Sequence, residues 1–155
     1  MPQIPKVYST PAIVLRQRKL GDADKILTLY SAAHGKLEVV AKGVRKTKSR
    51  FAGHVEPLTH ATFLLAKGRS MDIVTQVETV EPFQQVRDDL DRLSRGLYCC
   101  ELLDRFTELH ADNFGLYRLL LDTLRRLATR DDLDLPVRYY EMALLNEMGY
   151  RPELE

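Results

Sequence analysis

The sequence lacks most residues that mark metal-binding or disulfide-bonded proteins. It contains no tryptophan and only two cysteines, Cys99 and Cys100, which are adjacent. Neighbouring cysteines rarely form a disulfide within one helix, and neither a Cys-x-x-Cys pair nor a histidine cluster supplies the spacing of metal ligands. We therefore expect both thiols to be buried and unreactive, and we assign no metal site and no cofactor to this chain.

Catalytic and membrane signals are missing as well. The sequence has no Gly-x-x-x-x-Gly-Lys phosphate loop and no Gly-x-Ser-x-Gly nucleophile motif. Asp22 and Asp24 precede a strand pattern, where aspartates commonly form a turn. The chain also has no signal-peptide pattern and no apolar run long enough to cross a bilayer. These absences predict a cytoplasmic protein that is not an enzyme and does not contact membranes.

Charge is unevenly distributed along the chain. The formal net charge is +1, but residues 1–55 hold eleven Lys and Arg against three acidic residues, whereas residues 56–155 hold twelve against nineteen. A cationic front half and an anionic rear half indicate two surfaces with different partners. With 155 residues and 45% hydrophobic content, the chain can bury a core as one domain or as two small ones.

The basic run at residues 41–53 is the strongest functional signal. It contains five cationic side chains, two glycines and one aromatic ring, and it has no acidic residue. Small residues let a backbone lie close to phosphates, which Lys and Arg neutralise. A basic loop that follows a strand pattern therefore predicts contact with nucleic acid. The alternative is a solvated loop that only keeps the protein soluble.

The hydrophobic pattern before Pro82 is typical of strands. Apolar residues alternate with polar ones or form short runs, separated by turn-like pairs such as Gly21-Asp22 and His34-Gly35. The predicted strands cover residues 10–19, 25–30, 36–42, 59–67 and 72–81. Five strands in so short a segment indicate a five-stranded OB-fold β-barrel, because closure removes exposed sheet edges.

After Pro82 the hydrophobic period becomes helical. Leucines recur every three or four residues and predict a long helix over 86–109, a second helix capped by Asp112, and a third that starts at Asp134 and ends at Gly149. The predicted fold class is α+β, with an OB-fold nucleic-acid-binding domain over residues 1–81 and an α-helical domain over 82–155.

Several motifs together resemble one family. They are Gly21-Asp22-Ala23-Asp24-Lys25-Ile26, His34-Gly35-Lys36-Leu37, Ala41-Lys42-Gly43-Val44-Arg45-Lys46, Ser49-Arg50-Phe51, Glu56-Pro57, and Gly149-Tyr150-Arg151-Pro152-Glu153-Leu154. In this order they resemble the RecO family of bacterial recombination mediators. The resemblance implies a cytoplasmic, nucleoid-associated protein of DNA repair that binds single- and double-stranded DNA and anneals complementary strands. It further implies work with RecR to load RecA onto DNA covered by single-stranded-DNA-binding protein.

The resemblance also raises an expectation about the C-terminus. Many relatives continue from the Gly-Tyr-Arg-Pro-Glu-Leu motif into a four-cysteine zinc module, whereas this sequence stops at Glu155. We therefore expect a truncated chain with an incomplete helical domain, and we expect zinc only if a cysteine module follows Glu155.

Candidate DNA contacts come from the front half. We expect phosphate contacts that are largely independent of sequence. The loop supplies Lys42, Arg45, Lys46, Lys48 and Arg50, and the strands supply Lys36, Arg16 and Arg18. Glu38 weakens the case for the third strand. Phe51 or Tyr30 could stack on a base, although core packing is the simpler role for either ring.

The second predicted helix offers a candidate partner site. Arg118, Arg125 and Arg126 lie about two helical turns apart and border Leu121 and Leu124. The family resemblance implies that the tail of single-stranded-DNA-binding protein ends in acidic residues and a phenylalanine, which such a site could accept. The alternative is that these arginines pair with Asp122 and neighbouring acids.

Two other functions remain open from the sequence. One is an OB-fold RNA-binding module, which the barrel and its basic loop permit equally well. The other is a helical adaptor protein with a basic barrel, whose helices dock protein partners. Neither the oligomeric state nor the RecR interface can be read from the residues.

Overall fold

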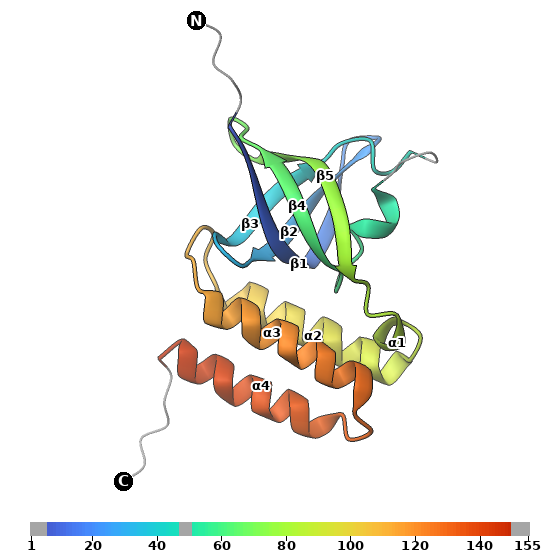
Figure 1. Cartoon of the computed structure of the whole chain (residues 1–155), viewed down its shortest axis with the longest axis vertical. Helices are drawn as coiled ribbons and strands as arrows, with labels where there is room; N and C mark the ends of the chain where they lie inside the picture. Colours follow the sequence, from blue (N-terminus) through green and yellow to red (C-terminus); the bar gives the residue numbers. More distant parts are fainter. Residues whose placement is uncertain (1–5, 47–50, 150–155) are drawn as a thin grey trace, which may run out of the picture.

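A closed five-stranded barrel forms the first half of the molecule (Figure 1). The computed structural model describes residues 6–46 and 51–149. Around the barrel the strands follow the order β1-β2-β3-β5-β4, and every pairing is antiparallel except that of β3 with β5. The strands are β1 (Val7–Leu20), β2 (Asp24–Ser31), β3 (Gly35–Ala41), β4 (His60–Ala66) and β5 (Asp72–Glu81).

Strand alternation gives the barrel two kinds of buried surface. On β2, Leu27 and Leu29 point into the barrel, whereas Tyr30 belongs to a separate core shared with the helices. The long strand β1 has a bulge between Val14 and Arg16, and Leu15 also faces the helical core. The barrel therefore presents an apolar outer patch on β1 and β2, on which the helices pack.

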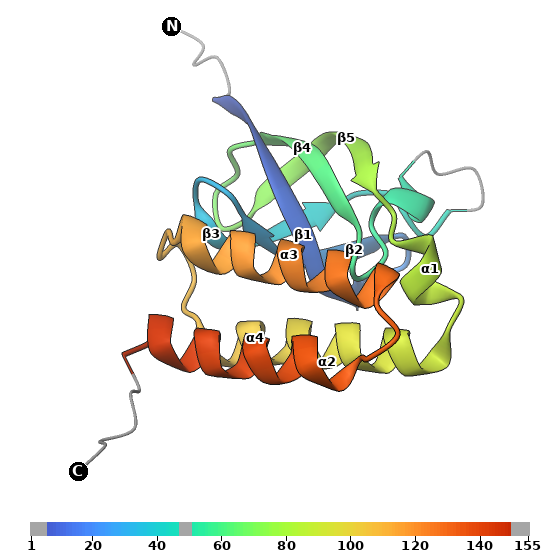
Figure 2. The same ribbon diagram turned by 60° about the horizontal axis from the view of Figure 1, so that its bottom comes forward.

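The helices form a layer against one side of the barrel (Figures 1 and 2). α2 and α3 contact the barrel strands, and α4 packs against α2 and α3. The bounds are η1 (Ala52–His54), α1 (Gln84–Arg87), α2 (Leu90–Phe106), α3 (Phe114–Thr129) and α4 (Asp134–Glu147). The expected fold, a five-stranded barrel followed by helices, is confirmed. None of the helices in the described ranges is long and apolar enough to cross a membrane.

Two details of the helical half differ from the sequence-based expectation. The expected single helix over 86–109 is wrong, because Asp88 and Asp89 separate α1 from α2, and Asp89 caps α2 by accepting from two backbone N–H groups. The expected cap at Asp112 is also wrong. Asn113 caps α3 instead, since its side-chain oxygen accepts from the Leu116 N–H at 3.2 Å. In both places a polar side chain one position away from the leucine pattern sets the boundary.

Candidate nucleic-acid interface

The turn between β1 and β2 packs against the loop that follows β3. The Arg45 backbone N–H donates to the Ala23 carbonyl at 2.9 Å, and the Arg45 guanidinium donates to the Gly21 carbonyl at 2.7 Å. The Gly43 N–H donates to the Asp24 carboxylate at 2.7 Å. Gly43 has a φ of +68°, which favours glycine. These bonds hold the two segments together as one surface, which we call the barrel tip (residues 18–23 and 42–46).

The barrel tip collects exposed cations. Arg18, Lys19, Lys42, Arg45 and Lys46 are exposed there. Within the described residues none of these five side chains forms an ion pair. The acids of the tip are few, since Asp24 is engaged by Gly43 and only Asp22 is fully exposed. A compact group of unpaired cations suits the phosphate backbone of a nucleic acid.

Sequence reasoning missed one member of this group and named two that lie outside the described part. Lys19 was not among the candidates, although its strand pairing with Lys25 next to the turn places it at the tip. Its proximity to the loop after β3 depends on tertiary contacts that no local pattern reveals. Lys48 and Arg50, which the sequence analysis singled out, lie outside the described residues.

Lys36 and Arg16 lie away from the tip, at the contact between barrel and helices. The Lys36 ammonium donates to the Asp104 carbonyl at 2.8 Å and to the Thr107 carbonyl at 2.7 Å, and it lies 3.2 Å from the Asp104 carboxylate. The Arg16 guanidinium pairs with the other Asp104 oxygen at 2.6 Å. We call Arg16, Lys36 and Asp104 the first seam cluster. Lys36 is only 9% exposed, so the structure gives it a bridging role between β3 and the end of α2.

The backbone around Lys36 strengthens this bridge. The His110 N–H donates to the Lys36 carbonyl at 2.9 Å. Gly35 has a φ of +66°, and a Cβ on it would lie 2.3 Å from the Ala111 carbonyl oxygen. The link between α2 and α3 therefore fits closely onto the start of β3, as Figure 1 shows on the left side of the molecule.

A second seam cluster joins the ends of β4 and β5 to α3. His60 is buried, with Nδ1 3.1 Å from the Glu81 carboxylate and Nε2 2.7 Å from the Tyr117 hydroxyl. The Arg125 guanidinium donates to both Glu81 oxygens at 2.6–3.1 Å. Burial lowers the pKa of His60 despite the neighbouring carboxylate, and the hydrogen bonds from Arg125 lower the pKa of Glu81. His60 is therefore neutral and Glu81 charged near neutral pH.

The two aromatic candidates for base stacking differ in exposure. Tyr30 is 0% exposed and packs in the core shared with the helices, so it cannot stack on a base. Burial raises the pKa of its hydroxyl to about 12, and that hydroxyl has no hydrogen-bond partner in the described structure. Phe51 is half-buried, packs against the barrel core, and lines a groove on the outer face of β1, β4 and β5.

The arginines of α3 do not share one environment. Arg118 pairs with Asp122 at 3.3 Å and Arg125 binds Glu81, so ion pairing, the expected alternative, holds at both. Arg126 lies on another side of the helix, 5.4 Å from the ring centre of Tyr139 on α4. Leu121 and Leu124 are buried, which leaves no space for a ring beside them.

An apolar pocket rimmed by cations lies next to Arg126. Its volume is about 340 Å³, and its lining consists of Arg126, Arg130, Leu135, Pro136 and Tyr139. Leu135 and Tyr139 are each 58% exposed, which is unusual for side chains of this size. This pocket has the composition that the sequence analysis expected around Leu121 and Leu124, but it is formed between α3 and α4.

The described residues offer no catalytic or metal-binding group. Cys99 and Cys100 are buried, and burial raises the pKa of the Cys99 thiol to about 12 and that of Cys100 further, so neither is a thiolate at neutral pH. Within residues 6–46 and 51–149, no group of three His, Cys, Asp or Glu side chains is placed to hold a metal ion.

Comparison with known proteins adds an independent finding. Residues 6–83 match the family model described as "Recombination protein O N terminal", and residues 87–155 match "Recombination protein O C terminal". The curated DNA repair protein RecO of Roseiflexus sp. (strain RS-1) is 43% identical over 149 residues, which cover 96% of this chain and 52% of that protein.

Other relatives give the same picture. The DNA repair protein RecO of Pelotomaculum thermopropionicum is 44% identical over 150 residues, covering 97% of this chain and 58% of the relative. That of Dehalococcoides mccartyi (strain CBDB1) is 38% identical over 150 residues, covering 59% of its length. The chain thus spans little more than half the length of these relatives.

Proposed function

The chain belongs to the RecO family, and from this premise we propose that it is a DNA-binding, strand-annealing recombination mediator in DNA repair. Its relatives carry the name DNA repair protein. In this proposal the chain works with RecR and helps RecA load onto DNA covered by single-stranded-DNA-binding protein. It performs no covalent chemistry, since annealing requires charge neutralisation and strand alignment only.

The observation that carries the proposal is the group of unpaired cations at the barrel tip. Lys42, Arg45 and Lys46 are exposed beside Arg18 and Lys19. Their contacts would be with phosphates, which are the same in every sequence, so binding is largely sequence-independent and includes both single- and double-stranded DNA. Such binding also supports annealing, because neutralised strands repel one another less.

A salt titration tests this mode of binding. If the tip engages about five phosphates, log affinity for single-stranded DNA falls against log salt with a slope of about −3.5. The measurement is fluorescence anisotropy of a labelled oligonucleotide at several salt concentrations. A slope near zero would rule out binding through the phosphate backbone. Comparison with RNA of the same sequence tests the alternative of an RNA-binding module, which predicts tighter binding to RNA.

The pocket between α3 and α4 supports a second part of the proposal, the contact with single-stranded-DNA-binding protein. We assign the acidic residues of that protein's tail to Arg126 and Arg130, and its terminal phenylalanine ring to the apolar surface of Leu135, Pro136 and Tyr139. Arg126 already lies over an aromatic face, where its guanidinium is partly desolvated and ready to accept a carboxylate. Arg118 and Arg125 are left out of this site because acids already pair with them.

A peptide with the tail sequence provides the test. Charge reversal by Arg126→Glu should abolish binding of the labelled peptide and leave DNA binding by the barrel nearly intact. Charge reversal at Arg105, which is exposed on α2 and pairs only with Glu101 on its own helix, is the matched control and should bind the peptide normally. Unchanged binding by the Arg126 variant would place the tail elsewhere.

A further inference from the structure

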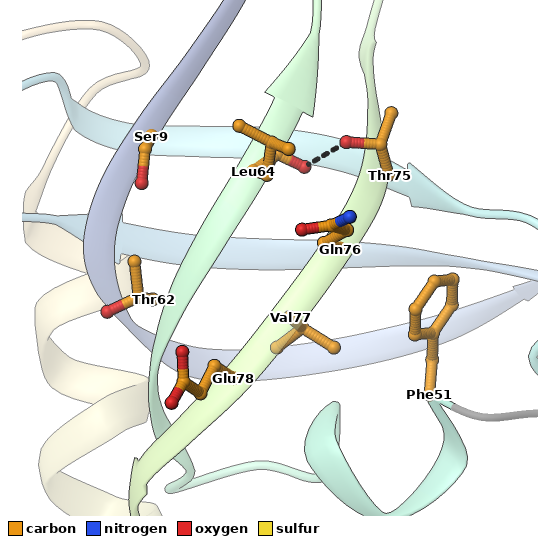
Figure 3. Close-up of a pocket in the computed structure, with 8 residues that line it drawn as sticks. All are labelled: Ser9, Phe51, Thr62, Leu64, Thr75, Gln76, Val77 and Glu78. Atoms are coloured by element: carbon orange, nitrogen blue, oxygen red, sulfur yellow. Dashed lines mark hydrogen bonds between the residues drawn. The ribbon is translucent and has the colours of Figure 1, made fainter.

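A groove of about 540 Å³ runs over the outer face of β1, β4 and β5 (Figure 3). It lies on the face formed by the outward-pointing residues of these strands, such as Thr62 on β4 and Gln76 on β5. Phe51 stands at one end, beside Val77, and Ser9 lies at the opposite side. Neither the barrel tip nor the pocket between α3 and α4 includes any of these residues.

We propose that this groove binds an unstacked base of single-stranded DNA. The base stacks on the face of Phe51, and its polar edge meets the side chains of Gln76, Glu78 and Thr62. The inference rests on the proposed DNA-binding function and extends it, because it gives the barrel a site that recognises single strands through their bases as well as their phosphates.

The chemistry of the groove fits a base and excludes a phosphate. Ser9, Thr62 and Gln76 supply uncharged donors and acceptors, and Glu78 adds a carboxylate that repels phosphate but accepts from the N–H groups of a base. Within the described residues these four side chains form no hydrogen bond to the rest of the protein. Their hydrogen-bonding groups are therefore available to a ligand.

The groove is shaped by an irregularity of the sheet. The pairing of β4 with β5 shifts register between Leu64 and Leu65, and the Thr75 hydroxyl donates to the Leu64 carbonyl at 3.0 Å beside the shift (Figure 3). Bulges commonly re-aim side chains next to binding sites. Here the shift leaves Leu64 and Val77 half-buried, which provides an apolar floor under the polar rim.

The groove is also within reach of the barrel tip. Phe51 follows Lys46 by five positions, so the chain between them can span at most about 18 Å. A strand whose phosphates lie on the tip cations can therefore place a base at Phe51 without leaving the barrel. Aromatic platforms next to basic surfaces are the usual combination in proteins that bind single strands.

The test compares a DNA strand with and without its bases. The probes are an oligothymidylate of about 16 nucleotides and an abasic strand with the same number of phosphates. The variants are Phe51→Leu, which keeps an apolar side chain against the barrel core, and Gln76→Ala, which removes only an exposed amide. Phe106→Leu is the matched control, because Phe106 is also partly exposed but lies at the end of α2.

Phe51→Leu should bind the oligothymidylate about 5- to 20-fold more weakly than the unchanged protein, the loss of a single stacked base. It should bind the abasic strand and duplex DNA as the unchanged protein does, with the same salt slope. Gln76→Ala should show the same selectivity with a smaller loss, and Phe106→Leu should show none.

The outcomes separate this inference from the function on which it depends. If tip variants weaken DNA binding but both groove variants bind the oligothymidylate normally, the groove inference is overturned and DNA binding stands. If both probes lose affinity equally in the Phe51 variant, Phe51 acts through the loop and not through a base, which also overturns it. If tip variants have no effect on either probe, the proposed function itself fails.

Discussion

At the barrel tip, Lys42 and Lys46 are exposed and have no acidic partner among the described residues, whereas at the seam Lys36 is 9% exposed and contacts three oxygens of the α2 end. Both sets of cations come from the same basic half of the sequence. The difference lies in their partners: seam cations are neutralised by Asp104, and tip cations are not. Charge in this molecule therefore serves stability where it is paired and DNA binding, as we propose, where it is left unpaired.

The largest expected effect comes from breaking the first seam cluster. Asp104→Ala removes the carboxylate from Arg16 and Lys36 at once and leaves a buried ammonium with fewer partners. The free energy of unfolding should fall by about 3 kcal/mol, the lower end for a broken buried pair. Chemical denaturation monitored by circular dichroism measures it.

A neighbouring carboxylate on the same helix supplies the control. Glu101 pairs only with Arg105, and both side chains are more than half exposed. Glu101→Ala should therefore change the free energy of unfolding by less than about 0.5 kcal/mol. If Asp104→Ala is equally mild, the seam does not hold the barrel to the helices in the way described.

Removing the tip cations should have the opposite profile. Lys42→Ala, Arg45→Ala and Lys46→Ala together should weaken binding to all DNA sequences alike, by roughly 10- to 100-fold near 0.1 M salt. The free energy of unfolding should hardly change, because the side chains are exposed and unpaired. Anisotropy titrations with two unrelated sequences, alongside denaturation, check both expectations. A triple variant that is folded and binds DNA with unchanged affinity would reduce the tip to a solvated loop.

Two adjacent arginines on α3 allow a finer comparison. Arg125→Gln loses the two-pronged contact with Glu81 and should cost about 1 kcal/mol of stability, since the pair is partly exposed. It should not affect binding of the tail peptide. Arg126→Gln should weaken peptide binding about tenfold and change stability by no more than about 0.5 kcal/mol. If the two variants behave alike, the assignment of Arg125 to the seam and Arg126 to the pocket is wrong.

The smallest expected effect is on pH dependence. Because the folded protein lowers the pKa of His60, the unfolded chain takes up a proton at this residue first as the pH falls below 6.5. Stability should therefore be fully present above pH 6.5 and decline below it, and the lowered pKa of Glu81 adds a further decline below pH 4.5. His60→Asn should be less stable at neutral pH but flatten the decline that begins at 6.5. A parallel decline in both proteins would show that His60 does not cause it.

The barrel could be predicted from the sequence because its strands carry the information locally. Alternation of apolar residues marks the strands closely, and glycines mark the turns: Gly21, Gly35 and Gly43 all have positive φ. The helix boundaries were harder to predict. Leucine spacing continues through the break at Asp88 and Asp89, so the periodicity alone could not reveal it.

The candidate site was only partly predictable, for a different reason. Whether a lysine is paired depends on segments distant in sequence, such as the end of α2 for Lys36 and the turn after β1 for Arg45. The sequence likewise could not show that neighbours on α3 face different partners, since one step of a helix turns a side chain by about 100°. Local pattern thus predicts which residues are charged and on which element, and tertiary packing decides which of them remain available.

The most direct test removes two charges from each region and compares the salt dependence of DNA binding. Lys42→Gln with Lys46→Gln represents the tip, and Arg16→Gln with Arg125→Gln represents the seam, where both arginines are partly exposed and paired with acids. The tip variant should make the slope of log affinity against log salt shallower by about 1.4, as expected for two lost phosphate contacts, and the folded seam variant should keep the full slope. Equal changes in both slopes would contradict the division between DNA-binding and structural cations.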